Sequence, residues 1–92
     1  MSQNNPPVAP KGHRFFRPPG AISYRGSSKT GLYRDVAKGL LTKPIKISGA
    51  RASGWPESEL IALNLARIAG KTVDQIRALV KQLEAARTEV VE

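Results

Sequence analysis

Basic and hydroxyl side chains recur at helical spacing between residues 28 and 38. If this segment is a helix, one of its sides carries Lys29, Thr30, Arg34 and Lys38. Asp35 is the only acidic residue in the segment. Ammonium and guanidinium groups donate strong hydrogen bonds to phosphate oxygens and to the acceptor edges of nucleic-acid bases. These residue types at this spacing therefore favour the binding of a polyanion.

A short helix from Lys29 to Lys38 is expected to carry these side chains. Leu32 and Val36 stand four residues apart, which places two apolar side chains on the opposite face. The hydroxyl of Ser28 can cap the first turn, and Gly39 can end the helix in the left-handed conformation. Because an isolated helix of about ten residues is marginal in water, it must pack on the rest of the domain through its apolar face.

The segment after this helix has the pattern of a β-hairpin. Residues 44–48 alternate apolar and polar side chains, residues 49–51 can turn, and residues 52–55 can return as a second, shorter strand. Three large apolar side chains are expected to face the core, namely Ile45, Ile47 and Trp55. Three basic side chains are expected to face solvent or a partner, namely Lys43, Lys46 and Arg51.

Two more helices are expected after the hairpin. The first runs from Glu57 to Ala69, and its wide apolar surface predicts contacts with the hairpin side of the domain and with the last helix. Gly70 ends it, and Thr72 with Gln75 can form a capping box that starts the last helix. That helix carries an apolar stripe of Ile76, Leu79, Val80, Leu83 and Ala86, with Arg77, Lys81, Glu84 and Arg87 outside it. It can either fold back on the domain or pair with a second copy.

The N-terminal region is expected to lead into these elements. Its polar, proline-rich start cannot bury enough apolar surface to offset the entropy of ordering. Phe15 and Phe16 are expected to pin the chain to the core, and the alternative is a basic arm that enters a groove. A first helix is expected from Pro18 to Tyr24, followed by a tight turn in which Gly26 takes a positive φ.

The order helix, turn, helix, two-stranded wing and helix is that of a winged helix-turn-helix. The expected fold is therefore mainly α with a small β-hairpin and an added C-terminal helix. Residues 1–14 are expected to be a disordered basic tail, and residues 15–69 a winged helix-turn-helix domain. Residues 70–92 are expected to form a C-terminal helix for packing or dimerisation.

Positive charge is concentrated in the first part of the chain. The 92 residues include 15 Lys and Arg against 7 Asp and Glu, which gives a net charge of +8. Ten of the basic residues and one acid fall within residues 1–56, whereas residues 57–92 hold five and six. This segregation predicts a polyanion-binding part joined to a support or assembly part. The alternative is a small basic protein whose charge serves only solubility.

Several classes of protein are not expected from this composition. The chain has no cysteine, so neither disulfides nor a thiolate zinc site can form. No apolar run approaches the roughly 20 residues of a membrane-spanning helix. Metal-ligand clusters, nucleophile–histidine pairs and phosphate-binding glycine loops are also missing, so no enzyme activity and no cofactor are expected. The expected location is cytoplasmic and nucleoid-associated.

Three blocks of sequence resemble the AlpA family of small phage- and prophage-associated regulators. They are residues 28–34 (SKTGLYR), 39–47 (GLLTKPIKI) and 51–60 (RASGWPESEL), and the similarity extends over about residues 15–90. The family is similar in fold to excisionases and to the DNA-binding domain of MerR proteins. The resemblance implies a regulator of a mobile element that acts as a transcription factor, an excisionase or both, with an integrase as a partner.

Sequence-specific binding to double-stranded DNA is the function that this pattern favours. The residues expected to contact DNA are Ser28, Lys29, Thr30, Tyr33, Arg34, Lys38, Lys43, Lys46 and Arg51. The runner-up is an RNA-binding or ribosome-associated protein, which the charge and size also permit, although paired aromatics for stacking bases are missing. A third class is a module that binds a protein partner through its last helix.

Overall fold

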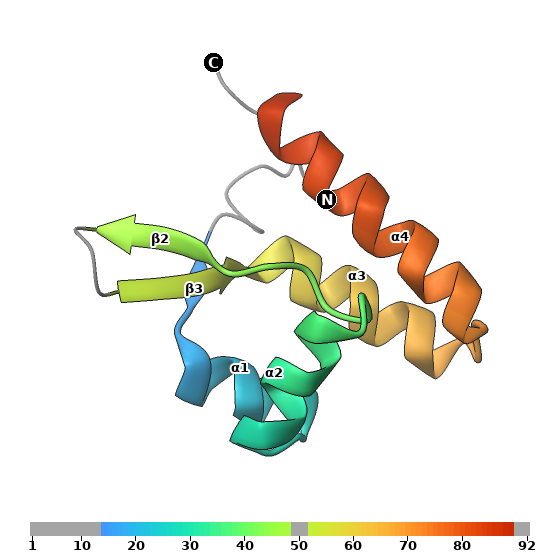
Figure 1. The fold of residues 1–92 in the computed structure, drawn as a ribbon, viewed down its shortest axis with the longest axis horizontal. Helices are drawn as coiled ribbons and strands as arrows, with labels where there is room; N and C mark the ends of the chain where they lie inside the picture. Colours follow the sequence, from blue (N-terminus) through green and yellow to red (C-terminus); the bar gives the residue numbers. More distant parts are fainter. Residues whose placement is uncertain (1–13, 49–51, 90–92) are drawn as a thin grey trace, which may run out of the picture.

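The computed structural model describes residues 14–48 and 52–89 of the chain. Its elements are β1 (Phe15–Phe16), α1 (Pro18–Arg25), α2 (Lys29–Ala37), β2 (Ile45–Ser48), β3 (Ala52–Pro56), α3 (Glu57–Ile68), α4 (Val73–Ala86) and a 3-10 turn (Arg87–Glu89). The described part is mainly helical with one small antiparallel sheet (Figure 1). None of its helices is long and apolar enough to cross a membrane. The predictions for residues 1–13, for Arg51 and for the side chain of Ile47 lie outside the described residues.

Local signals set the helix ends close to where the sequence predicts them. The hydroxyl of Ser28 accepts a hydrogen bond of 3.0 Å from an N–H of the first turn, which confirms it as the cap of α2. Gly39 follows α2 with a φ of 76°, in the left-handed region that glycine enters without steric cost. Thr72 and Gln75 form both hydrogen bonds of the capping box at the start of α4.

A short turn connects α1 to α2. The first helix ends at Arg25, one residue beyond the prediction, and Gly26 follows it with a φ of 69°. The second helix ends at Ala37, one residue before the prediction. Asn64 on α3 donates a hydrogen bond of 3.3 Å to the carbonyl of Tyr24, so the end of α1 is held to the body of the domain.

The sheet has three strands, in the order β1-β3-β2, where the sequence predicts two. Both strands of the predicted hairpin are present, and they pair antiparallel. The additional strand β1 pairs Phe15 with Pro56 and Phe16 with Trp55. A strand this short shows no alternation along the sequence, and its partner lies far along the chain. The predicted hairpin is therefore confirmed, and β1 is a third strand that the sequence did not predict.

Trp55 lies at the centre of the core. Its side chain has 0% exposure, and its indole N–H donates a hydrogen bond of 2.6 Å to the carbonyl of Thr42. Its buried apolar neighbours come from α1, α2, the α2–β2 connection, α3 and α4, and they are Ala21, Leu32, Leu41, Leu60, Leu63 and Val80. Phe16 packs against this cluster, whereas Phe15 is exposed and Ile45 is only half-buried. The prediction of a core tryptophan is confirmed, and that for Ile45 holds only in part.

The last helix folds back along its own chain. Val80 is buried, and Ile76, Leu79 and Leu83 pack against the core. The apolar stripe of α4 is thus used inside the domain, which is the first of the two alternatives for this helix. Ala86, at the end of the predicted stripe, remains exposed.

One apolar face of α3 is not covered by the described residues. Leu60 and Leu63 are buried, but Leu65 and Ile68 are 59% and 81% exposed. The elements that pack on α3 are α1, β3 and α4, and they leave this second face to solvent. The predicted contacts of α3 with the hairpin side of the domain and with the last helix are therefore confirmed, although part of its wide apolar surface remains exposed.

Candidate nucleic-acid interface

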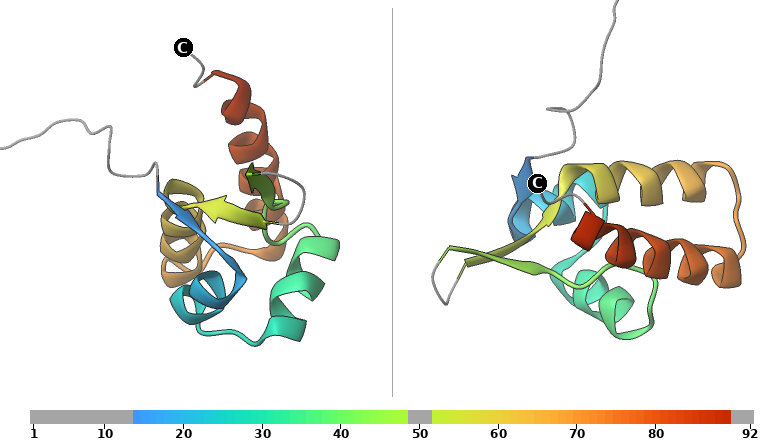
Figure 2. Two further views of the ribbon diagram at one scale, coloured as in Figure 1. Left: turned by 90° about the vertical axis from the view of Figure 1, so that its left-hand side faces the viewer. Right: turned by 90° about the horizontal axis from the view of Figure 1, so that it is seen from above.

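The second helix and strand β2 lie on the same side of the molecule. In both panels of Figure 2, α3 is at one edge and α2 is at the opposite edge. The strand β2 is an edge strand and lies on the α2 side of β3. Side chains from α2 and from the start of the hairpin can therefore approach one surface of a ligand.

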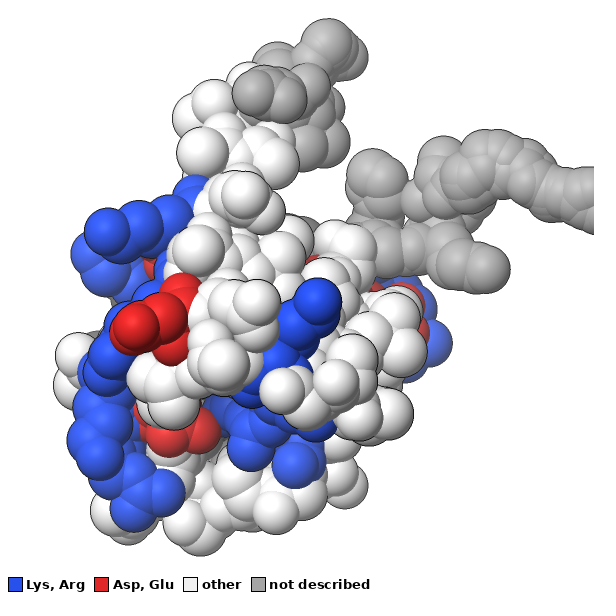
Figure 3. Space-filling view, turned by 90° about the vertical axis from the view of Figure 1, so that its right-hand side faces the viewer, with Lys and Arg blue, Asp and Glu red and all other residues white. Residues whose placement is uncertain are grey.

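The outer side of α2 is a row of solvent-exposed polar side chains. Its exposed members are five of the predicted contact residues, Lys29, Thr30, Tyr33, Arg34 and Lys38. They face outward because helical periodicity turns Leu32 into the core. Figure 3 shows Lys and Arg side chains running down the edge of the molecule that corresponds to the front of Figure 1, where α2 lies.

Ser28 combines an exposed position with a structural role. Its Oγ accepts the hydrogen bond from the N–H of Gly31, so one lone pair is used inside the helix. A Cβ on Gly31 would lie 3.2 Å from this oxygen, which shows how tightly the first turn is built around the cap. The hydroxyl proton can still donate to a ligand beside Lys29.

Two substitutions of Ser28 should separate these roles. Ser28→Ala should destabilise the fold by about 1 kcal/mol because the first turn loses its cap. Ser28→Asp should keep the stability, since aspartate caps as well as serine, but it should weaken polyanion binding through its negative charge. Thermal unfolding and heparin affinity measure the two effects. Equal stability of Ser28→Ala and the wild type would contradict the capping role.

The single acid of α2 is held by a buried arginine. Asp35 accepts a hydrogen bond of 3.0 Å from Arg25, whose side chain is 1% exposed. Burial lowers the pKa of Arg25, and its hydrogen bond to Asp35 opposes that shift. The guanidinium of Arg34 lies 4.0 Å from the other carboxylate oxygen. The negative charge of Asp35 is therefore compensated by two arginines, and the outward charge of α2 is positive.

The role of Arg25 was not predicted from the sequence. Its partner Asp35 lies ten positions later on a different helix, and no local pattern connects the two. In the sequence, the only signal for the pair of Arg25 and Asp35 is their opposite charge. Several other basic residues in this region could equally have paired with Asp35.

Tyr33 belongs to both the surface and the core. Its side chain is 40% exposed, and its ring centroid lies 6.1 Å from that of Trp55 at a tilt of 55°. Tilted aromatic pairs at such distances attract each other. The contact anchors the middle of α2 to the core while the outer part of the ring remains accessible to a ligand.

Two lysines extend the exposed positive surface toward the hairpin. Lys46 lies on β2 opposite Ser53, and Lys43 lies just before this strand. Both are exposed. We define the basic face as the exposed residues Lys29, Thr30, Arg34, Lys38, Lys43 and Lys46. Arg51, the predicted contact at the hairpin tip, lies outside the described residues.

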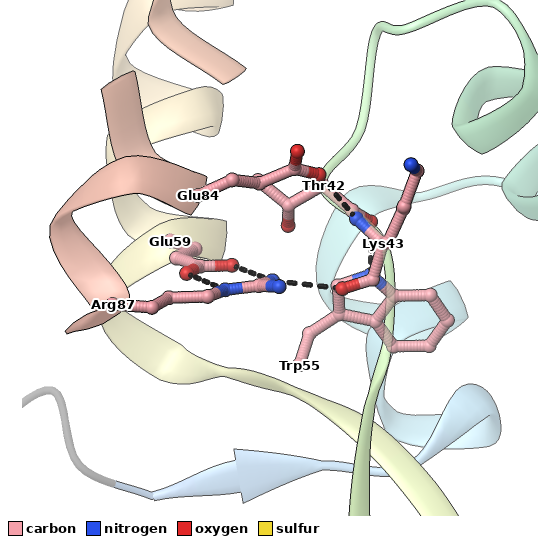
Figure 4. Close-up of polar contacts among 6 residues, drawn as sticks. All are labelled: Thr42, Lys43, Trp55, Glu59, Glu84 and Arg87. Atoms are coloured by element: carbon pink, nitrogen blue, oxygen red, sulfur yellow. Dashed lines mark hydrogen bonds and ion pairs between the residues drawn. The ribbon is translucent and has the colours of Figure 1, made fainter. Parts of the chain in front are cut away.

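The main chain of Lys43 is held by the end of α4 and by the 3-10 turn that follows it (Figure 4). Its N–H donates a hydrogen bond of 2.8 Å to Glu84, and its carbonyl accepts one of 2.7 Å from Arg87. Arg87 also donates two hydrogen bonds of 2.7 Å to the buried carboxylate of Glu59. These bonds to Glu59 raise the pKa of Arg87. The sequence predicts that Arg87 lies outside the apolar stripe. It does not identify the partners of Arg87, Glu59 and Lys43, which are 28 and 44 positions away.

No family model, curated protein or solved structure matches the chain. The function must therefore be argued from the side chains of the basic face and from the elements that position them.

Proposed function

We propose that the protein is a sequence-specific double-stranded DNA-binding protein of the winged helix-turn-helix type. The observation that carries the proposal is the basic face, whose exposed cations come from α2 and from the start of the hairpin, elements that lie on one side of the molecule. The acid within this stretch, Asp35, is already compensated by Arg25. Several exposed cations on one side of the molecule can replace the counterions of a phosphate backbone.

The connection between α1 and α2 supports this proposal. Residues 26–28 separate the two helices, and a turn of three to four residues with a glycine is typical of helix-turn-helix motifs. In such motifs the N-terminal part of the second helix reaches base edges in the major groove. Lys29, Thr30 and Arg34 would then read bases, and the lysines at 38, 43 and 46 would contact phosphates. The β2–β3 hairpin would serve as the wing.

We further propose that the protein regulates a mobile element, as a transcription factor, an excisionase or both. The support is the resemblance of residues 28–34, 39–47 and 51–60 to the AlpA family. Both activities use the same DNA-binding unit, and an integrase would be the additional partner of an excisionase.

Arg34→Ala should reduce affinity for the duplex that the protein selects from a random library. The expected loss is roughly 5- to 150-fold, the value of a specific base contact of about 1–3 kcal/mol. Affinity for a scrambled duplex should fall less, because non-specific binding loses one positive charge whereas the selected duplex loses that charge and a base contact. Arg67→Ala is the matched control, since Arg67 is also exposed but lies on α3. Its affinity should stay within about twofold of the wild type, because it makes no contact with the bound duplex.

A comparison of three ligands of equal length tests the class of function. The selected duplex should bind more tightly than a scrambled duplex and than single-stranded RNA. Equal affinity for all three ligands would leave only a basic protein without sequence recognition. Preference for RNA would contradict the proposal and favour the RNA-binding alternative.

A further inference from the structure

Two side chains of α4 and one from the 3-10 turn that follows it bond to the main chain between α2 and β2. Arg77 donates a hydrogen bond of 2.9 Å to the carbonyl of Lys38, at the end of α2. Glu84 and Arg87 bond to the N–H and the carbonyl of Lys43, before the start of β2. We refer to these three side chains as the α4 clamp. Both residues that the α4 clamp holds, Lys38 and Lys43, belong to the basic face.

The geometry at Lys43 separates its main chain from its side chain. Both polar groups of its main chain are hydrogen-bonded, to Glu84 and to Arg87, and Figure 4 shows its side chain extending away from these two residues. The preceding carbonyl, that of Thr42, is bonded to the indole of Trp55. The peptide segment is thus fixed on both sides, while the ammonium group remains exposed.

From this geometry we infer that Arg77, Glu84 and Arg87 are positioning residues for DNA binding. They fix the main chain from which Lys38 and Lys43 extend their ammonium groups. They also hold the end of α2 in a fixed position relative to the start of β2. The inference rests on the proposed function. Because a cation that is already held in place loses less entropy when it binds a phosphate, loosening this segment should weaken binding even though every lysine is still present.

Replacing Glu84 by alanine distinguishes an effect of charge from an effect of positioning, because the two predict opposite changes in affinity for duplex DNA. Removing an acid from a DNA-binding protein should strengthen binding if charge alone matters. If Glu84 positions Lys43, Glu84→Ala should instead weaken affinity for duplex DNA by roughly three- to tenfold, and it should lower the salt slope by about one phosphate contact. Glu84→Gln should bind at least as tightly as the wild type, because glutamine keeps an oxygen that can accept the N–H of Lys43.

A double-mutant cycle with Lys43→Ala isolates the positioning effect. Lys43→Ala alone should weaken binding and lower the salt slope by about one. Adding Glu84→Ala to this variant should change affinity by less than about twofold, because the side chain being positioned is already gone. Gln82→Ala is the control, since Gln82 is an exposed polar residue on the same helix and is not one of the three clamp residues. Its affinity should stay within about twofold of the wild type. Circular dichroism at the binding temperature must show that every variant is folded.

The outcomes distinguish the inference from the proposed function. If the wild type shows no preference for duplex DNA, the proposed function fails. If the wild type binds duplex DNA but Glu84→Ala binds as tightly or more tightly, the positioning inference alone is overturned. The same conclusion follows if Lys43→Ala has no effect, or if the losses from Lys43→Ala and Glu84→Ala are additive.

Discussion

Asp35→Ala should strongly destabilise the protein, although it removes the one acid from a basic helix. Arg25 is almost completely buried, and Asp35 is the hydrogen-bond partner of its guanidinium among the described residues. Removing one member of a buried ion pair leaves an uncompensated charge, which typically costs about 3–5 kcal/mol. Since domains are stable by only about 5–15 kcal/mol, a large fraction of the variant should be unfolded near physiological temperature.

Urea denaturation measures this effect directly. The unfolding midpoint of Asp35→Ala should fall far below that of the wild type, whereas Asp74→Ala should change the free energy of unfolding by about 0.5 kcal/mol or less. The double replacement Arg25→Met with Asp35→Leu should recover much of the loss, because apolar residues of similar volume can replace a buried pair. An Asp35→Ala midpoint equal to that of the wild type would contradict the buried ion pair.

Trp55→Ala is expected to be at least as destabilising. The side chain has no exposed surface, and replacing a buried tryptophan by alanine typically costs about 3–5 kcal/mol. The carbonyl of Thr42 would also lose its hydrogen-bond donor, and the ring of Tyr33 would lose its neighbour. The loss would therefore loosen both the middle of α2 and the approach to β2.

Two matched variants resolve the contributions of Trp55. Trp55→Phe keeps an aromatic ring but not the indole N–H, so it should lose less stability than Trp55→Ala. Phe15→Ala removes an exposed aromatic ring from the neighbouring strand and should cost much less than either. Chemical denaturation should rank the three variants in this order. A small effect of Trp55→Ala would contradict the placement of this side chain at the centre of the core.

The helices were predictable because their signals are local. Ser28 caps α2, and Thr72 with Gln75 caps α4. Gly39 takes the left-handed conformation after α2. Each of these residues lies within four positions of the helix end that it marks. The outward row on α2 was predictable for the same reason, since helical periodicity fixes which side chains oppose Leu32. The structure confirms that Ser28, beside this row, caps the helix.

The unpredicted features depend on contacts between distant positions. The strand β1 exists because β3 offers it a pairing edge, and the pair of Glu59 and Arg87 joins α3 to the end of α4. The bonds of Glu84 and Arg87 to Lys43 depend on how α4 folds back. Periodicity marks such residues only as polar, and it does not identify their partners.

The exposed face of α3 shows the opposite limitation of sequence patterns. The wide apolar surface of this helix predicted contacts on two sides, and both are present, yet Leu65 and Ile68 remain exposed. A pattern indicates which side chains gain from burial, but only the packed elements decide which of them are covered.

An NMR titration with duplex DNA tests the central claim most directly, because it identifies the surface that binds even when the preferred DNA sequence has not been determined. If the basic face is the DNA-binding surface, the largest amide shift changes should fall within residues 28–38 and 43–46. The amides of residues 65–73, at the far end of α3 and the start of α4, should change little. Shift changes centred on residues 65–73, with α2 unaffected, would contradict the proposed interface.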